Sequence, residues 1–375
     1  MRSSTSKKKT KAGKLNMGEM RKLINKKAGT NVAHDLTKEN PTEVKEWIPT
    51  GSRWLDSIVC RGKLAGIPVG KVTEIAGLEA TGKSYMAAQI AANAQKMGIG
   101  VVYFDSESAI DPDFLQRTGC DLSNLLYIQA TTVEFVLESI EELIGSGQKL
   151  LFIWDSLALT TVEKDLEGDY NPQSSMAVKA RILSKGMPKL TVPLANAQCT
   201  FLVLNQLRAN ITSNIAEAMT TPFFTPGGRT MIYTYSLRIW LTGRKAKASF
   251  VIDEKGFRIG SEVKAKLQKS RFGTEGRMCN FKILWGADIA VRDEESWLDA
   301  IKGSNALTNA GAWYTLTTKK GKDFKFQGKQ WIEKLQDPEF RQSVFDIMDE
   351  EIIMKFDKRE GDAKEFYDSD GEGEA

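Results

Sequence analysis

Apolar and polar positions alternate in a way that divides the chain into distinct regions. Between residue 51 and about residue 287, apolar runs of strand type alternate with stretches at helical spacing. This order predicts a mostly parallel, twisted β-sheet with crossover helices, and therefore an α/β core. Four runs are apolar almost throughout, as expected of strands that are buried on both faces. They are Lys71–Ile75, Val101–Phe104, Leu150–Trp154 and Thr200–Leu204.

The pattern changes on both sides of this core. Residues 15–35 predict a short helical arm, since Met17, Met20, Leu23 and Ile24 recur at helical spacing. After Trp285, short helical stretches and a Lys/Gly-rich hairpin around Thr318–Lys325 predict a small α+β domain. We therefore expect an arm at 1–48, a core at 49–287, a C-terminal domain at 288–358 and a tail at 359–375.

Charge is distributed unevenly, although the net charge is only +4. The first fourteen residues carry basic but no acidic side chains, whereas residues 360–375 are strongly acidic. Both ends are typical of disordered segments. They either keep the protein soluble, or act as a basic arm that attracts nucleic acid and an acidic tail that competes with it. The sequence leaves both interpretations open.

Several protein classes are excluded or disfavoured. No apolar run reaches 18 residues and no secretory signal is present, so we expect no membrane association. Four dispersed cysteines predict reduced, mostly buried thiols in a cytoplasmic protein. Because His34 is the only histidine, a histidine zinc site or a Ser-His-Asp triad is almost excluded.

The strongest motif matches G-x-x-x-x-G-K-[ST], the P-loop. A predicted strand enters it, and a helix with Met86 and Ile90 on one face leaves it, so an anion would meet a helix N-terminus. The backbone N–H groups would hold the phosphates of ATP, Lys83 would neutralise their charge, and Ser84 would bind Mg²⁺. The motif consists of Gly77, Leu78, Glu79, Ala80, Thr81, Gly82, Lys83 and Ser84.

Polar residues at the ends of three other predicted strands complete this site. Asp155 follows a buried apolar run and would share the Mg²⁺, although a helix N-cap is an alternative. Glu107 would orient or deprotonate the attacking water; an ordinary surface carboxylate is equally common at such a place. Gln206 would sense the terminal phosphate through its amide. The predicted catalytic residues are thus Glu107, Lys83 and Gln206.

These motifs, in this order, resemble the RecA family of strand-exchange recombinases over residues 50–356. The matching segments are Thr50-Gly51-Ser52, the P-loop, Phe104-Asp105-Ser106-Glu107, Ile153-Trp154-Asp155-Ser156, Leu204-Asn205-Gln206-Leu207-Arg208, Gly227-Gly228 and Ala310-Gly311-Ala312-Trp313-Tyr314. The resemblance implies a RecA-type core and a DNA-dependent ATPase. Such a protein polymerises on single-stranded DNA and pairs it with homologous duplex DNA, and it meets single-strand-binding and loader proteins.

The resemblance also implies roles for further residues. Tyr85, Asp111 and Phe114 would bind the nucleotide, the last two at its adenine. Lys269 and Arg271 would reach the ATP of a neighbouring subunit, and the helical arm would pack on that subunit. Residues 163–175 correspond to the first DNA loop and residues 209–226 to the second. The implied DNA-binding residues are Met176, Arg181, Arg208, Phe223, Phe224, Gly227, Gly228 and Arg229.

The DNA side rests on less evidence from the residues themselves. The first loop is acidic, so its assignment depends on the resemblance alone. Phe223 and Phe224 would stack on bases or form an ordinary apolar patch. Five lysines of the C-terminal hairpin would gather duplex DNA or simply be solvated. They are Lys319, Lys320, Lys322, Lys325 and Lys329.

Departures from the family pattern indicate a divergent, phage-encoded member. The second loop is a few residues longer, Arg271 replaces a lysine, Phe114 replaces a tyrosine and Ser108 stands where histidine is usual. Two other functions remain as alternatives, a ring-forming helicase-like motor and a non-catalytic recombination mediator. The Asn205–Arg208 segment and the Trp313 region disfavour the first; Lys83, Ser84, Glu107 and Asp155 together disfavour the second.

Overall fold

The computed structural model describes residues 16–167, 175–211, 222–243, 249–285 and 290–355. The chain forms two compact units, Met1–Lys45 and Glu46–Ala375, which are described separately. The charged ends discussed above lie outside the described residues. Within the described residues, no helix is long and apolar enough to cross a membrane. All four cysteines are buried thiols, as predicted.

The first unit contains helix α1 (Met17–Ala28), which is shorter than the arm predicted over 15–35. The Asn16 side chain caps its start, and Gly29 ends it in a left-handed conformation with φ of 69°. The chain then turns back, because the Asn25 side chain accepts hydrogen bonds from the backbone N–H groups of Val32 and Ala33. These interactions explain why the helical spacing does not continue to residue 35.

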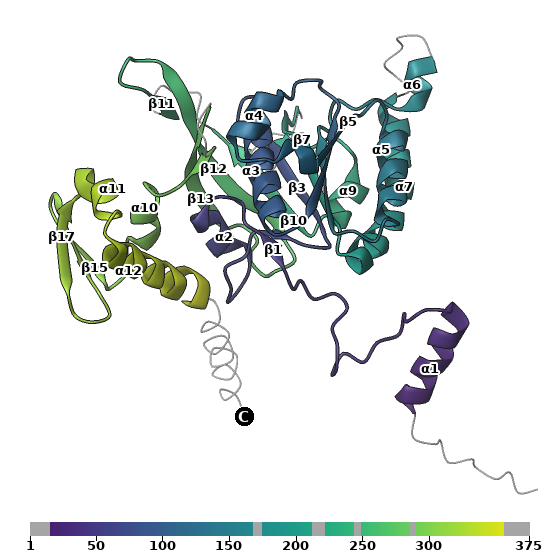
Figure 1. Ribbon diagram of the computed structural model, residues 1–375, viewed down its shortest axis with the longest axis horizontal. Coiled ribbons are helices and arrows are strands. Elements are labelled where there is room, and N and C mark those ends of the chain that lie inside the picture. Colours follow the sequence, from purple (N-terminus) through teal and green to yellow (C-terminus); the bar gives the residue numbers. More distant parts are fainter. Residues whose placement is uncertain (1–15, 168–174, 212–221, 244–248, 286–289, 356–375) are drawn as a thin grey trace, which may run out of the picture. The chain divides into compact units, whose positions relative to one another are not determined.

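The second unit is built on a ten-stranded sheet of order β14-β13-β12-β10-β3-β7-β6-β4-β5, with β11 paired to β12 (Figure 1). Its parallel part comprises β3 (Val72–Gly77), β4 (Gly100–Asp105), β5 (Leu125–Gln129), β6 (Leu150–Asp155), β7 (Thr200–Gln206) and β10 (Leu237–Thr242). Its antiparallel part comprises β11 (Phe250–Ile252), β12 (Arg258–Ser270), β13 (Met278–Leu284) and β14 (Val291–Arg292). The α/β class and the four predicted strands are confirmed.

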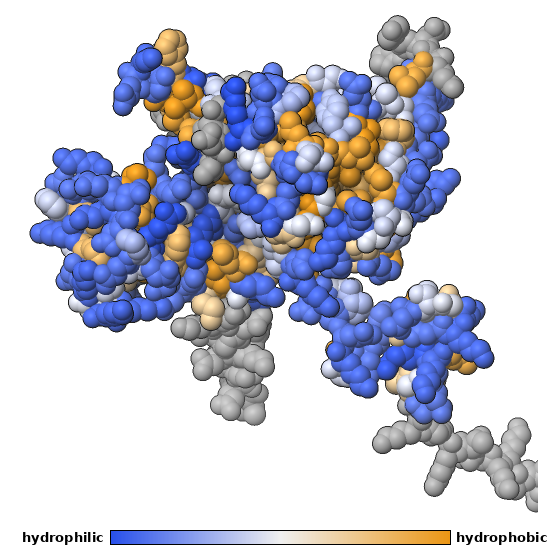
Figure 2. Space-filling model, viewed as in Figure 1, coloured by the Kyte–Doolittle hydropathy of each residue, from blue (hydrophilic) through white to orange (hydrophobic). Residues whose placement is uncertain are grey.

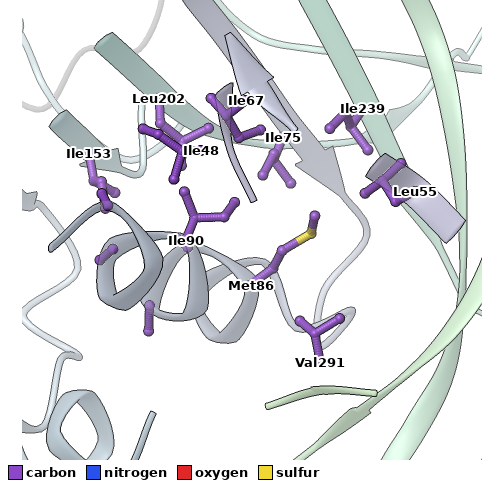
Figure 3. Close-up of a cluster of buried hydrophobic side chains, with 14 of the residues drawn as sticks. Ile48, Leu55, Ile67, Ile75, Met86, Ile90, Ile153, Leu202, Ile239 and Val291 are labelled. Carbon is purple, nitrogen blue, oxygen red and sulfur yellow. The ribbon is translucent and has the colours of Figure 1, made fainter. Parts of the chain in front are cut away.

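Successive side chains of each strand point to opposite faces of the sheet. Each face carries an apolar cluster, and helices cover both faces. On one face, Met86 and Ile90 of α3 pack with Ile75 and Leu202 in the cluster drawn in Figure 3. On the other face, Phe152 and its neighbours pack against α5 and α7. The helices are α2 (Arg53–Val59), α3 (Lys83–Lys96), α4 (Pro112–Arg117), α5 (Val133–Ile144), α6 (Glu163–Glu167), α7 (Ser175–Ala197) and α9 (Arg229–Thr234), with a 3₁₀ turn at Leu122–Asn124.

Shorter elements complete the unit. Two-stranded pairs join β1 (Trp47–Ile48) to β2 (Ile67–Pro68) and β8 (Arg208–Ala209) to β9 (Phe223–Phe224). At the opposite edge from β14, the strand β5 exposes Leu126 and Tyr127. Figure 2 shows apolar surface over the side of the sheet where β5 and α5 lie.

The C-terminal part has a three-stranded antiparallel sheet and an apolar cluster of its own, which includes Trp297, Phe326 and Phe340. The predicted hairpin is formed by β16 and β17. Asp293 attaches this part to the core, since its Oδ2 accepts hydrogen bonds from Ser52 Oγ and Trp54 N at 2.8 Å each. The elements are α10 (Trp297–Ile301), β15 (Leu307–Ala310), β16 (Trp313–Thr317), β17 (Asp323–Gln327), a 3₁₀ turn at Gly328–Gln330, α11 (Trp331–Lys334), α12 (Pro338–Met348) and a π-helical turn at Asp349–Met354. The domain boundaries stay predictions.

Candidate functional site

The carboxyl ends of four parallel strands bring the predicted catalytic residues to one edge of the sheet. In the β3–β7 ladder Gly77 is the register partner of Gln206. In the β4–β6 ladder Asp105 is the partner of Asp155, and Glu107 follows two residues after Asp105. Ligands of open α/β sheets bind at this edge. The structure therefore assembles the P-loop, Gln206, Asp155 and the Glu107 segment in one place.

The P-loop leaves β3 and opens onto the N-terminus of α3. Ala80 and Gly82 have left-handed φ angles of 57° and 81°. The φ angle favours glycine at position 82, where a Cβ atom would also lie 2.6 Å from Ile283 Cδ1. The loop thus has the tight backbone curl and the helix N-terminus that a phosphate group needs. The residues present fit the predicted nucleotide.

Lys83 lies over this loop. Its Nζ donates hydrogen bonds to Leu78 O at 3.1 Å and Gly77 O at 3.4 Å. Burial lowers the pKa of Lys83, whereas the carboxylates of Asp155, Glu107 and Glu79 raise it. The ammonium is therefore held at the P-loop backbone, within electrostatic range of both predicted functional carboxylates.

Ser84 and Asp155 form the predicted metal site. Ser84 Oγ donates to Asp155 Oδ2 at 2.7 Å, and Tyr103 Oη donates to the same oxygen at 2.8 Å. Burial raises the pKa of Asp155, while these two hydrogen bonds lower it. Hydroxyl and carboxylate oxygens suit Mg²⁺. Among the described residues, no group of three or more His, Cys, Asp or Glu side chains that could hold a metal ion occurs.

Glu107 is exposed and is held by Ser156, whose Oγ donates to Glu107 Oε1 at 2.8 Å. The turn that carries Glu107 is shaped by the buried Asp105. Its Oδ1 accepts from Glu107 N at 2.9 Å and its Oδ2 from Ala109 N at 3.1 Å. Sequence reasoning missed these supporting roles of Tyr103, Asp105 and Ser156. The available signals were a polar residue inside or next to an apolar strand and, for Asp105 and Ser156, their place in two of the matching segments named above.

The predicted adenine side lies between the starts of α3 and α4. Tyr85 and Phe114 pack edge to face with ring centroids 4.5 Å apart. Asp111 is the N-cap of α4 and accepts a hydrogen bond from Asp113 N at 3.0 Å. This arrangement brings two of the predicted aromatic residues together, and their contact with adenine stays a prediction.

A buried polar network connects the strands β3, β7 and β10 with the end of the predicted second DNA loop. Glu74 Oε2 and Arg238 Nε form an ion pair at 2.6 Å, and Arg238 Nη2 donates to Thr225 Oγ1 at 2.9 Å. Asn205 Nδ2 donates to Glu74 Oε1 and to Pro226 O at 3.0 Å each. Charged residues in otherwise apolar strands were the signal that sequence reasoning overlooked. The network joins β3, β7 and β10 to the end of the loop.

Lys269 and Arg271 lie elsewhere. In the sheet register Lys269 of β12 is the partner of Arg238 of β10, and Arg238 is in turn the partner of Glu74 near the start of β3. Lys269 and Arg271 therefore lie toward the amino end of β3, whereas the P-loop follows its carboxyl end. Lys269 Nζ donates to Ile232 O at 2.6 Å, and Arg271 Nη2 donates to Tyr233 O at 2.7 Å. The structure does not bring them to the P-loop of their own chain. Their contact with a neighbouring subunit's ATP stays a prediction.

Four of the eight predicted DNA-binding residues, Arg208, Phe224, Gly227 and Gly228, line a cavity of about 480 Å³. Arg208 of β8 pairs with Phe224 of β9, next to Phe223, so these two strands bracket the second loop. Gly227 and Gly228, with φ of 111° and 82°, precede α9, whose first residue is the exposed Arg229. Arg181 is exposed on α7. Residues 168–174, residues 212–221 and the side chain of Met176 lie outside the described part of the chain.

The lysines of the C-terminal hairpin have acidic neighbours. Lys319 Nζ lies 2.8 Å from Glu350 Oε1, and Lys322 Nζ lies 2.5 Å from Glu339 Oε2. Lys325 lies over the ring of Trp313. Because two of the five charges are paired, a duplex-gathering patch here would depend mainly on the other three.

Comparison with known proteins agrees with this geometry. The family model RecA N-terminal domain matches residues 16–290. Protein RecA of Symbiobacterium thermophilum is 30% identical over 366 residues, which cover 95% of this chain and 98% of that protein. Protein RecA of Fusobacterium nucleatum is 32% identical over 292 residues, covering 78% of this chain and 73% of that protein. Protein RecA of Streptomyces avermitilis is 31% identical, covering 74% and 70%.

Proposed function

The chain belongs to the RecA family of DNA recombination and repair proteins, and we propose that it is a DNA-dependent ATPase that polymerises on single-stranded DNA and catalyses homologous pairing and strand exchange. One observation carries the proposal. The P-loop, the Ser84–Asp155 pair and Glu107 share the sheet edge from which β7 leads into the second DNA loop. The helicase-like motor and the non-catalytic mediator are not favoured, since the similarity to Protein RecA extends over nearly both whole chains.

The nucleotide in this proposal is ATP with Mg²⁺, which supplies the phosphoanhydride bond and the charge neutralisation at its phosphates. The backbone of residues 77–84 would bind the phosphates, and Lys83 would neutralise them. Ser84 and Asp155 would hold the metal through the oxygens that already lie 2.7 Å apart. Tyr85, Asp111 and Phe114 would line the adenine side.

Glu107 would orient the attacking water and accept its proton. The Ser156 hydroxyl, which donates to Glu107 Oε1 at 2.8 Å, would keep the carboxylate in place. Gln206 stands beside Gly77 in the sheet register, where its amide would respond to the terminal phosphate. Asn205, the preceding residue, hydrogen-bonds to the end of the second DNA loop.

On the DNA side, Arg181, Arg208 and Arg229 would contact phosphates, and Phe223 and Phe224 would stack on bases. Such contacts are sequence-tolerant, as homologous pairing requires. Lys269 and Arg271 would contact ATP bound to the next copy of the chain, whose surface would also accept α1. Phe114, Ser108 and Arg271 are consistent with a divergent, phage-encoded member.

The decisive experiment measures ATP hydrolysis with and without single-stranded DNA, comparing wild type with Glu107→Gln. We expect weak hydrolysis alone and strong stimulation by DNA. Glu107→Gln should bind ATP and DNA but turn over at least about 100-fold more slowly, because its amide cannot accept a proton. The control Glu138→Gln, an exposed carboxylate on α5, should behave like wild type.

Two results would contradict the proposal. Hydrolysis by wild type that ignores single-stranded DNA at every salt and nucleotide concentration would remove the recombinase function while leaving a P-loop ATPase. Undiminished turnover by Glu107→Gln would remove the catalytic role of Glu107.

A further inference from the structure

One lysine near the DNA-facing cavity takes no part in the site described so far. Lys179 is the fifth residue of α7, the helix that follows the first DNA loop. Its Nζ donates to three backbone carbonyls, those of Leu157 at 2.5 Å, Ala158 at 3.3 Å and Thr160 at 2.6 Å. Three hydrogen bonds are the most that an ammonium can donate. The side chain therefore clamps the turn at 156–160 to the helix.

The clamped turn begins at Ser156, the residue that holds Glu107. Ser156 O accepts hydrogen bonds from Ser106 Oγ at 3.0 Å and from Thr160 Oγ1 at 2.9 Å. Leu157 N donates to Leu204 O at 3.0 Å, so the turn is also attached to β7 just before Asn205 and Gln206. A shift of α7 would thus be transmitted through Lys179 to the two strand ends that carry Glu107 and Gln206.

We propose that Lys179 is a positioning residue that couples DNA bound beside α7 to the hydrolytic site, by fixing the 156–160 turn on which the Ser156–Glu107 hydrogen bond depends. The inference rests on the proposed function. It concerns the transmission of the DNA signal, and it assigns no contact between Lys179 and either DNA or nucleotide.

The surroundings of Lys179 support this role. It borders the cavity of about 480 Å³ together with Arg208, Phe224, Gly227 and Gly228. Burial and, to a smaller extent, the nearby Arg208 lower the pKa of Lys179 to about 8, against an opposing effect of Asp165. Because only the protonated side chain can donate all three hydrogen bonds, the clamp weakens as the pH rises through this value.

The experiment compares wild type, Lys179→Met, Lys179→Arg and the control Lys189→Met, which alters an exposed lysine farther along α7. Two ratios are measured. The first is the turnover of ATP with single-stranded DNA divided by the turnover without it, with kcat and KM determined separately. The second is the affinity for a labelled oligonucleotide, by fluorescence anisotropy, with a non-hydrolysable ATP analogue divided by the affinity without nucleotide. Thermal unfolding confirms that each variant is folded.

We expect Lys179→Met to reduce the turnover ratio about tenfold through kcat, the effect typical of losing a supporting residue. It should also bring the affinity ratio close to one, whereas in wild type that ratio is about fivefold or more. Lys179→Arg should restore most of both ratios. Its stimulated turnover should persist at high pH, whereas that of wild type should fall as the pH rises through about 8. Lys189→Met should match wild type.

Wild-type ratios in Lys179→Met would overturn the inference. So would an equal loss of turnover with and without DNA, which indicates a merely structural role. A loss of oligonucleotide affinity in the absence of nucleotide that accounts for the whole effect would also overturn it. Absence of DNA stimulation in wild type would instead contradict the proposed function, so the two failures are distinguishable.

Discussion

The predicted nucleotide-binding edge of the sheet and the predicted DNA-facing surface are built in different ways. At the nucleotide edge each functional group is held by another: Ser84 and Tyr103 bind Asp155, and Ser156 binds Glu107. On the DNA-facing surface, Arg208 and Phe224 are exposed and lie on two-residue strands. Hydrolysis requires fixed atoms. Sequence-tolerant DNA binding requires charge and rings that can adapt to any base.

The two regions are connected by the buried network around Glu74 and Arg238. It reaches from β3, which enters the P-loop, to Thr225 and Pro226 at the end of the predicted second DNA loop. The residues proposed to contact nucleotide and those proposed to contact DNA are nevertheless different, so substitutions in either region should have separable direct effects.

The largest effect is expected at the nucleotide edge. Lys83→Met should reduce ATP hydrolysis by about 100- to 1,000-fold, because it removes the ammonium that lies on the P-loop and would neutralise the phosphate charge. Nucleotide-independent binding of single-stranded DNA should be retained. Steady-state hydrolysis and anisotropy measure the two quantities, with the exposed Lys96→Met at the end of α3 as the control. Equal losses in both assays would show that the regions are not separable.

A smaller effect is expected from the residue that supports Glu107. Ser156→Ala removes the hydroxyl that donates to Glu107 Oε1 and should lower kcat about tenfold with little change in KM. The exposed Ser146→Ala serves as the control. An unchanged kcat would mean that Glu107 is positioned without Ser156, and the contrast with the DNA-facing surface would then be weaker.

The smallest effects are expected on the DNA side, where several contacts share the binding. Phe224→Ala should cost about 1 kcal/mol in oligonucleotide affinity at all salt concentrations, through lost stacking. Arg208→Met should instead reduce the slope of log affinity against log salt by about 0.7, because one phosphate contact is lost. Both variants should keep their DNA-independent hydrolysis. Anisotropy titrations across a salt series distinguish them from the exposed control Phe257→Ala. Identical salt slopes for Arg208→Met and wild type would exclude a phosphate contact.

Much of the nucleotide edge could be predicted from the sequence, because its motifs are local. The P-loop, Asp155 and Glu107 each follow an apolar strand, and parallel strands bring such ends together. The four strands and the buried cysteines were likewise found as expected. A local pattern is sufficient wherever neighbouring residues determine both the element and its chemistry.

The remainder depends on which distant segments become neighbours. Glu74 and Arg238 are separated by 164 positions in the sequence, and they form an ion pair only because β10 lies beside β3 in the sheet. Tyr103, Ser156 and Lys179 acquire their roles in the same way, from partners on other elements. Helix α1 is shorter than the predicted arm because the Asn25 side chain accepts hydrogen bonds from the backbone of Val32 and Ala33, where the chain turns back. Helical spacing does not reveal this interaction.

Strand exchange tests the central claim most directly. Wild type would be mixed with a labelled single strand, ATP and Mg²⁺, and then with a duplex that is either homologous or unrelated in sequence. The account predicts joint molecules with the homologous duplex alone, and none from Lys83→Met. Equal product from both duplexes, or unwinding of the duplex without pairing, would contradict the assignment as a recombinase.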